Sequence, residues 1–151
     1  MIILGAGGHA RELLDIINLI DNGEHYFFDD SVKELPEFIN GINVIRQFEV
    51  ALRLIQDGHE IVLGVGGVHA RKNFYRKFSQ HGITAKSIIA PSCIISDYNV
   101  IIDEGVNVMH HVLISNNVRV GKNVLINSKV NLHHDVTVGD FCEIAPGATL
   151  L

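Results

Sequence analysis

The fold of this chain is decided by a stretch that repeats every six residues. Written in sixes from residue 100, it reads VIIDEG, VNVMHH, VLISNN, VRVGKN, VLINSK, VNLHHD, VTVGDF, CEIAPG and ATL, and it ends at residue 150. The first position is valine in every six except those that begin with Cys142 and Ala148. The third position is always isoleucine, valine or leucine, from Ile102 to Leu150. A sustained hexapeptide period is the repeat of a β-helix.

Each six predicts a short strand followed by a corner. Side chains two residues apart on a strand share one face, so pairs such as Val118 and Val120 are expected to fill the interior. Segments such as 121–123 and 139–141 are expected to form the corners, because glycine and asparagine tolerate a left-handed backbone. Three strands close a triangular coil of about 18 residues, so residues 90–151 supply a little over three coils.

A second set of apolar residues in this region is expected to face outward and to need a partner surface. The set is Ile95, Ile101, Leu113 and Leu125. Cys142 stands in the inward column and is expected to pack there rather than act as a nucleophile. The chain stops in mid-repeat at a pair of leucines, which predicts either a chain cut short or a final coil covered by another surface.

Residues 1–86 follow a different pattern, in which apolar strands alternate with helices. Residues 1–4, 26–28 and 61–63 are predicted strands, whereas helical spacing follows residue 8 and covers residues 50–55. Strands that alternate with helices predict βαβ units and a parallel sheet. The predicted fold class is therefore α/β followed by β, with one domain over residues 1–86 and another over residues 87–151.

Composition narrows the possible functions. The chain has 151 residues, 47% of them hydrophobic, and a formal net charge of −5, which argues against nucleic acid as a partner. No apolar run approaches the roughly 20 residues of a membrane span, and the N-terminus lacks the features of a secretory signal. Cys93 and Cys142 are isolated, as expected for reduced thiols in a cytoplasmic protein.

The N-terminal half offers three candidate ligand-binding segments. Gly5-x-Gly7-Gly8-His9 lies where a strand turns into a helix, whose free N–H groups suit a phosphate. Asp29 and Asp30 end the second strand, where a carboxylate can accept hydrogen bonds from a ribose or a base. A second glycine turn, residues 64–67, precedes Arg71 and Lys72, which could pair with phosphates. The alternatives are a tight turn, a cap and a solvated helix face, respectively.

The C-terminal half offers one further candidate site, His133-His134-Asp135. His134 comes two residues after the inward Leu132, where the strand gives way to a corner, so its side chain is expected to face out. Histidine can take a proton near neutral pH, and Asp135 could fix the ring tautomer and stabilise the imidazolium. The alternative is a surface histidine. His110 repeats the offset of His134 but is expected at a different edge, and a metal site is not expected.

Taken together, these motifs resemble the sialic acid O-acetyltransferase and sugar-nucleotide N-acetyltransferase family of bacterial hexapeptide-repeat acyltransferases. The resemblance covers essentially the whole chain. The motifs that carry it are Gly5-Ala6-Gly7-Gly8-His9-Ala10, Phe28-Asp29-Asp30, Gly64-Val65-Gly66, Arg71-Lys72, Ala90-Pro91-Ser92, residues 126–141 and Ala145-Pro146-Gly147-Ala148.

The resemblance implies a small Rossmann-like domain that binds a nucleotide-sugar substrate, followed by a left-handed parallel β-helix that forms a homotrimer. It implies acetyl-CoA as co-substrate, no metal and no covalent acyl-enzyme. His134 resembles the family's general base, with Asp135 as its orienting carboxylate and Asn127 as an active-site asparagine. The residues that would bind the nucleotide sugar are Gly7, Gly8, His9, Asp29, Asp30, Gly64 and Arg71.

Two departures from the family pattern stand out. Glu143 occupies the position of a second family histidine that helps to bind the acetyl donor, so Glu143 is the candidate donor-binding residue here. The β-helix is also C-terminally short, since relatives continue for several more coils that supply much of the CoA groove.

The resemblance favours an acetyl-CoA-dependent N-acetyltransferase of a nucleotide-linked amino sugar in surface-glycan synthesis. Two alternatives remain open. The acceptor could be a hydroxyl, as in a sialic acid O-acetyltransferase. The chain could also be a sugar-nucleotide binding module that is inactive through loss of the distal coils.

Overall fold

The computed structural model describes residues 1–31 and 34–151, which form two compact units. The first is Met1–Val65 and the second is Gly66–Leu151. The predicted domain boundary between residues 86 and 87 stays a prediction. No helix in the described part of the chain is long and apolar enough to cross a membrane.

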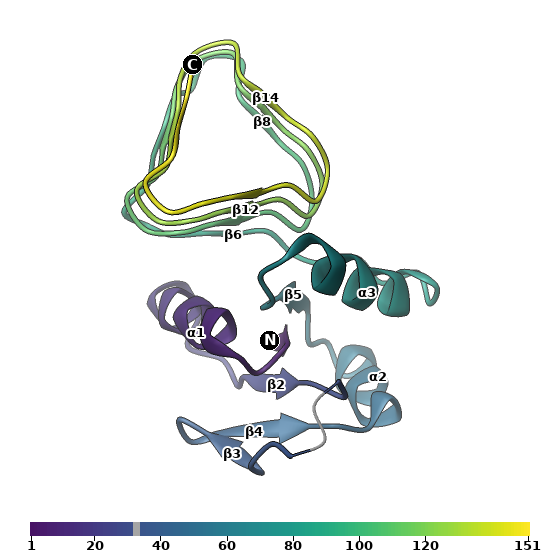
Figure 1. The fold of residues 1–151 in the computed structure, drawn as a ribbon. Helices are drawn as coiled ribbons and strands as arrows, with labels where there is room; N and C mark the ends of the chain where they lie inside the picture. Colours follow the sequence, from purple (N-terminus) through teal and green to yellow (C-terminus); the bar gives the residue numbers. More distant parts are fainter. Residues whose placement is uncertain (32–33) are drawn as a thin grey trace. The chain divides into compact units, whose positions relative to one another are not determined.

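The first unit is built on a five-stranded sheet with the order β3-β4-β2-β1-β5 (Figure 1). Neighbouring strands run parallel except for β3, which pairs antiparallel with β4. In chain order its elements are β1 (Ile2–Leu4), α1 (Gly8–Ile20), β2 (Tyr26–Phe28), β3 (Phe38–Ile39), β4 (Ile42–Ile45), α2 (Phe48–Gln56) and β5 (Ile61–Leu63).

Burial explains why these segments form a parallel sheet. All residues of β1 and β5 are buried, as expected for strands covered on both faces. Helix α1 buries one apolar face that includes Leu13 and Ile17, while Ile20 at its end is exposed. The predicted βαβ pattern is confirmed, but the β3–β4 hairpin was not predicted. Its strands are short, and Asn40 and Gly41 make its turn with positive φ.

The second unit consists of helix α3 (Val68–Ser79) and a coil of two-residue strands stacked in three parallel sheets. Figure 1 shows the triangular outline of the coil. It is a left-handed parallel β-helix, as the resemblance implied, and so an exception to the right-handed crossover rule. Its strands are β6 (Ile88–Ile89), β7 (Ile94–Ile95), β8 (Ile101–Ile102), β9 (Asn107–Val108), β10 (Leu113–Ile114), β11 (Arg119–Val120), β12 (Leu125–Ile126), β13 (Asn131–Leu132), β14 (Thr137–Val138), β15 (Glu143–Ile144) and β16 (Thr149–Leu150).

The corners of the coil share one backbone conformation. The last residue of each six has positive φ, whatever its side chain. These residues are Asn99, Gly105, His111, Asn117, Asn123, Lys129, Asp135, Phe141 and Gly147. Asparagine and glycine adopt this conformation readily, whereas lysine and phenylalanine are rare in it. The predicted corners are confirmed, and the repeat itself imposes their geometry.

The two inward columns form the core of the coil. Residues from Val106 to Leu132 in these columns are almost completely buried. Cys142 is exposed, so the packing predicted for it is wrong. Cys142 directly precedes β15, which is the end strand of its sheet and pairs with β12 on one side.

The structure also corrects the set of outward apolar residues. Ile95 packs against the core, and its neighbour Ile94 is the outward residue, 68% exposed. The reason is one extra residue in the first coil, because Ile94 pairs with Leu113, 19 residues later, whereas Ile101 pairs with Arg119, 18 residues later. Leu125 is buried within the chain itself.

Candidate active site

His134 and Asp135 form a hydrogen-bonded pair at the corner that follows β13. Nδ1 of His134 lies 2.8 Å from Oδ2 of Asp135. The side chains are 75% and 64% exposed, so the imidazole faces outward rather than into the coil. The left-handed backbone of Asp135 turns the chain at this point. The geometry therefore gives a ring that is accessible to a substrate and held from one side.

The surroundings of Asp135 determine which ring nitrogen can act as a base. Hydrogen bonds from Asn117 and then from His134 hold the pKa of the Asp135 carboxyl below its ordinary value. An ionised carboxylate can only accept hydrogen bonds, so Nδ1 of His134 carries the proton in this contact. In the neutral ring, Nε2 then keeps its lone pair, as a general base requires.

Two asparagines complete this corner, and neither was predicted as a site residue. Nδ2 of Asn117 donates to Oδ1 of Asp135, and Nδ2 of Asn99 donates to Oδ1 of Asn117. The signal was present in the spacing, because residues 99, 117 and 135 are 18 residues apart and occupy one edge of successive coils.

Asn127, the third predicted catalytic residue, lies after β12, on a different side of the triangle. Its Nδ2 donates to the backbone oxygen of Ile144 at 2.9 Å. None of the contacts described for the chain joins it to His134 or Asp135. A role in the same reaction stays a prediction.

His110 occupies the same position of its six as His134 but lies at another edge. Its Nδ1 is hydrogen-bonded to Oγ of Ser92 at 2.9 Å. The expected difference in edge is confirmed by the strand pairing, since β9 and β13 belong to different sheets. Within residues 1–31 and 34–151, no three His, Cys, Asp or Glu side chains form a group that could hold a metal ion.

The glycine-rich turn of the first unit leads into α1 as predicted. Gly7 is the N-cap of α1 and Gly8 its first residue, and both are exposed. A Cβ atom at either position would meet nothing within 4 Å. Gly7 also has negative φ, so neither backbone strain nor packing explains these two glycines. His9, which is half-buried, lies in the first turn of the helix.

The two acidic residues after β2 are in different environments. Asp29 is buried, and its carboxylate accepts hydrogen bonds from the backbone N–H of Ala6 at 3.1 Å and from Ser31 Oγ at 2.6 Å. It therefore ties the glycine-rich turn to the end of β2. Asp30 is exposed and better placed to meet a ligand.

Gly64 has a packing reason to be glycine. A Cβ atom there would lie 2.4 Å from Cγ2 of Ile3 and 3.1 Å from Cβ of Ala10. Its close contact with β1 and α1 explains the residue without any ligand, and its role in binding a substrate stays a prediction.

Arg71 differs most from its prediction. The solvated helix face considered for it is wrong, because its side chain is completely buried. Nε donates to the backbone oxygen of Asn123 at 3.0 Å, and Nη2 to those of Val124 at 3.4 Å and Gly105 at 3.5 Å. Burial lowers the pKa of Arg71 to about 10, and the charge of Glu143 partly opposes this. Arg71 therefore fastens α3 to a corner of the coil and is not exposed to a phosphate.

Glu143, the predicted donor-binding residue, lies on the exposed side of β15. Its Oε2 accepts a hydrogen bond of 2.6 Å from the N–H of Gly67, the N-cap of α3. A carboxylate at this position satisfies an open backbone donor and interacts favourably with the helix dipole. Its role in donor binding stays a prediction.

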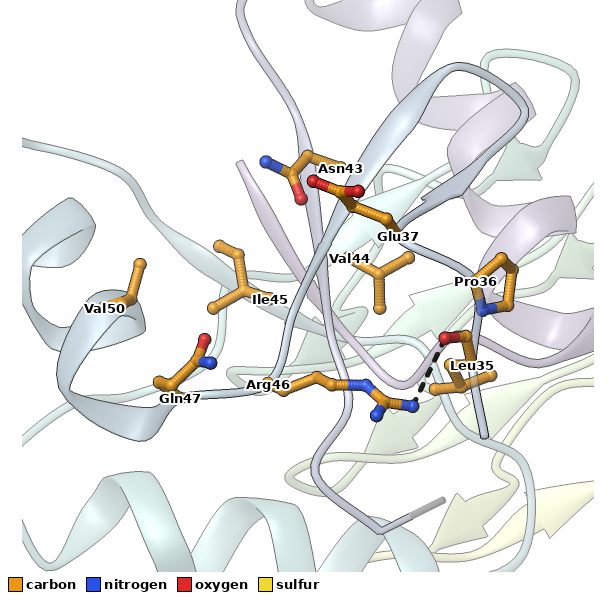
Figure 2. Close-up of a pocket in the computed structure, with 9 residues that line it drawn as sticks. All are labelled: Leu35, Pro36, Glu37, Asn43, Val44, Ile45, Arg46, Gln47 and Val50. Atoms are coloured by element: carbon orange, nitrogen blue, oxygen red, sulfur yellow. Dashed lines mark hydrogen bonds between the residues drawn. The ribbon is translucent and has the colours of Figure 1, made fainter. Parts of the chain in front are cut away.

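A pocket of about 370 Å³ opens in the first unit at the carboxyl end of β4 (Figure 2). On one side, Nη2 of Arg46 donates to the backbone oxygen of Leu35 at 3.4 Å. In doubly wound sheets, ligands bind outside the carboxyl ends of the strands. The lining residues are Leu35, Pro36, Glu37, Asn43, Val44, Ile45, Arg46, Gln47 and Val50.

Comparison with known families gives two matches. Residues 1–78 match the PglD N-terminal domain, and residues 117–151 match the bacterial transferase hexapeptide (six repeats). No curated protein matches the chain significantly.

Several solved structures share the fold of the whole chain. The acetyltransferase domain of PglB from Neisseria gonorrhoeae FA1090, in complex with acetyl coenzyme A, is 26% identical with a TM-score of 0.87, over 99% of this chain and 72% of its own. GDP-perosamine N-acetyl transferase from Caulobacter crescentus is 24% identical with a TM-score of 0.83, over 98% and 69%. WeeI from Acinetobacter baumannii AYE is 20% identical with a TM-score of 0.82, over 98% and 70%. At these lower identities, the last two show the fold alone.

Proposed function

We propose that this chain transfers the acetyl group of acetyl-CoA to the amine of a nucleotide-linked sugar. The chain belongs to the sugar N-acetyltransferase family that joins a PglD N-terminal domain to hexapeptide repeats. The chain is an acetyltransferase. The observation that supports the finer proposal is the exposed His134, whose Nδ1 is held by Asp135.

In the proposed reaction, Nε2 of His134 takes a proton as the neutral amine attacks the thioester carbonyl carbon. The carbon–sulfur bond then breaks, the CoA thiolate leaves, and the imidazolium returns the proton to it. The products are the N-acetyl sugar and free CoA. Asp135 stabilises the imidazolium between the two proton transfers, as the acid of a catalytic triad does.

The donor is proposed from a similar protein, the acetyltransferase domain of PglB, whose structure contains acetyl coenzyme A. The nucleotide-sugar acceptor is proposed to bind in the first unit at the carboxyl edge of the sheet. There the exposed Gly7 and Gly8 leave the N-terminus of α1 open, and Asp30 is exposed.

We propose further that the chain acts as a homotrimer in the cytoplasm. Support for self-association comes from apolar side chains on the outside of the coil, which include Ile94 and Ile101, 68% and 41% exposed. A cytoplasmic location fits a reaction that uses acetyl-CoA and a sugar nucleotide, and it fits two free cysteines.

The decisive experiment replaces His134 by alanine and follows CoA release with acetyl-CoA and a panel of UDP- and GDP-linked amino sugars. Removal of a general base is expected to lower kcat by about 10²- to 10⁴-fold. His110→Ala is the matched control, because it removes a histidine from the same position of another six and should leave kcat within about twofold of the wild type.

Retention of wild-type kcat in His134→Ala would refute the assignment of the base. Acceptor specificity is tested separately, with free sialic acid as the hydroxyl acceptor. Faster transfer to the hydroxyl than to every amine would refute N-acetylation and favour O-acetylation. Binding of a sugar nucleotide without any binding of acetyl-CoA, measured by calorimetry, would favour an inactive binding module.

A further inference from the structure

One edge of the coil carries a continuous column of polar side chains beneath the candidate base. The column is defined by Asn99, Asn117 and Asp135, which occupy the left-handed corner position in three successive coils. Their φ values are 53°, 59° and 65°, so the three Cα–Cβ bonds leave the backbone in nearly the same way. We refer to these three residues as the Asp135 column.

Backbone hydrogen bonds hold the coils in register at this edge. The N–H of Asn117 donates to the oxygen of Tyr98 at 3.0 Å, and the N–H of Asp135 donates to the oxygen of Asn116 at 3.2 Å. Each corner is thereby stacked on the one before it. The side chains of the Asp135 column repeat this stacking, since each asparagine donates its Nδ2 to the Oδ1 of the next member.

The direction of these hydrogen bonds matters for the carboxylate. Asn99 uses its donor on Asn117, which leaves the Asn117 oxygen as an acceptor and turns the Asn117 NH₂ toward Asp135. Oδ1 of Asp135 therefore accepts the hydrogen bond from Asn117 in the preceding coil, and Oδ2 is directed to Nδ1 of His134. Without this contact, an exposed aspartate would be free to rotate about χ1 and χ2.

We propose that Asn117 is a positioning residue for the acetyltransferase reaction, which acts by fixing the carboxylate of Asp135 so that His134 is held in the tautomer with its proton on Nδ1. The proposal rests on the function proposed for His134. It concerns a residue that does not touch the substrate and that acts through the contact between Asp135 and His134.

The lowered pKa of the Asp135 carboxyl also supports a positioning role for Asn117. The hydrogen bond from Asn117 is the largest cause of the lowered pKa of Asp135, ahead of the contact with His134. A carboxyl that stays ionised keeps accepting the Nδ1 proton of His134 as the pH falls. Asn117 thus favours both the orientation and the charge that the base requires.

The test replaces Asn117 by glycine, which removes the side chain and still tolerates the positive φ of this corner. Transfer is expected to become about tenfold slower in kcat, a fraction of the full contribution of a general base, with the KM values of both substrates unchanged. The ¹⁵N chemical shifts of the His134 ring should show a loss of the Nδ1–H tautomer. The ¹³C titration of the Asp135 carboxyl should move to higher pH.

Two further variants separate positioning from general damage to the coil. His111→Gly makes the same change at a left-handed corner position of another edge, and it should leave kcat, tautomer and carboxyl titration unchanged. Asn117→Asp keeps the shape but exchanges the donor for a charged acceptor next to Asp135. It should raise the pKa of Asp135 more than Asn117→Gly does, because like charges disfavour ionisation.

The outcomes distinguish this proposal from the function on which it rests. An Asn117→Gly variant that folds and keeps the wild-type tautomer and the wild-type titration of Asp135 overturns the positioning role, even if His134 is the base. If Asn117→Gly does not fold, the same two spectra of Asn117→Asp decide. If His134→Ala retains full activity while the tautomer shifts in Asn117→Gly, the proposed base is wrong and the contact itself stands.

Discussion

Replacement of Arg71 by alanine is expected to destabilise the second unit by about 0.5 to 2.5 kcal/mol. The side chain is completely buried and donates to the backbone oxygens of Asn123, Val124 and Gly105. One good charged hydrogen bond and two long ones contribute about 2 to 4 kcal/mol. Alanine keeps Cβ, so the two buried methylene groups that are lost contribute about 1.6 kcal/mol at ~0.8 kcal/mol each.

The burial of the charge opposes this stabilisation. Burial lowers the pKa of Arg71 to about 10, and at about 1.4 kcal/mol per pKa unit this costs roughly 3 kcal/mol. Subtraction gives the net loss of about 0.5 to 2.5 kcal/mol for Arg71→Ala. Methionine keeps most of the apolar stem and carries no charge, so Arg71→Met is expected to cost about 0 to 1 kcal/mol.

The assay is urea unfolding followed by far-UV circular dichroism, since the chain has no tryptophan to report by fluorescence. Each variant is measured at several protein concentrations, because self-association would make the midpoint depend on concentration. Arg76→Ala is the control, as it removes an exposed arginine from the same helix and should change stability by less than about 0.5 kcal/mol. Equal stabilities of Arg71→Ala and Arg76→Ala would refute the reasoning.

Four other predictions concern individual residues. Asp135→Asn removes the carboxylate that accepts the Nδ1 proton of His134 and should lower kcat about 10²-fold in the CoA-release assay, with unchanged stability; a normal kcat would contradict the orienting role. In the wild type, ¹³C NMR should find the Asp135 carboxyl titrating below the ordinary aspartate range, so that its contact with His134 is lost only as the pH falls through that lowered pKa. Gly64→Ala forces a Cβ atom to within 2.4 Å of Ile3 and should cost about 1 to 3 kcal/mol. Gly7→Ala, whose Cβ would meet nothing within 4 Å, should cost only about 0.5 kcal/mol in the same urea experiment, because alanine is a poorer N-cap than glycine. Glu143→Gln keeps an acceptor for Gly67 but removes the charge from the N-terminus of α3, and thermal unfolding at low salt should report a loss of about 0.5 to 1 kcal/mol that disappears at high salt.

The coil could be predicted from the sequence because its repeat is strict from Val100 onward. The inward columns except at Cys142, the corners and the outward ring of His134 all follow from counting in sixes. The same counting fails before Val100, where one extra residue shifts the register and exchanges the faces of Ile94 and Ile95. A one-residue shift moves each side chain to the opposite face of its strand.

The sequence was less informative where function depends on contacts between distant residues. Arg71 lies among other basic residues on α3, and nothing in the local sequence indicates that its guanidinium is buried against Asn123. Leu125 has the spacing of an outward residue, yet it is covered within the chain. Such contacts depend on which segments pack together, which neither periodicity nor residue type records.

The additional residue of the first coil has a consequence for how this architecture can be changed. Between Ile95 and Ile102 the chain takes seven steps instead of six, yet both side chains still pack against the core. The extra residue is accommodated at a vertex of the triangle, and the next coil returns to the normal spacing. Vertices are therefore the places where loops, tags or whole modules can be spliced into the solenoid, whereas a single residue inserted inside a strand would turn the apolar stripe toward water.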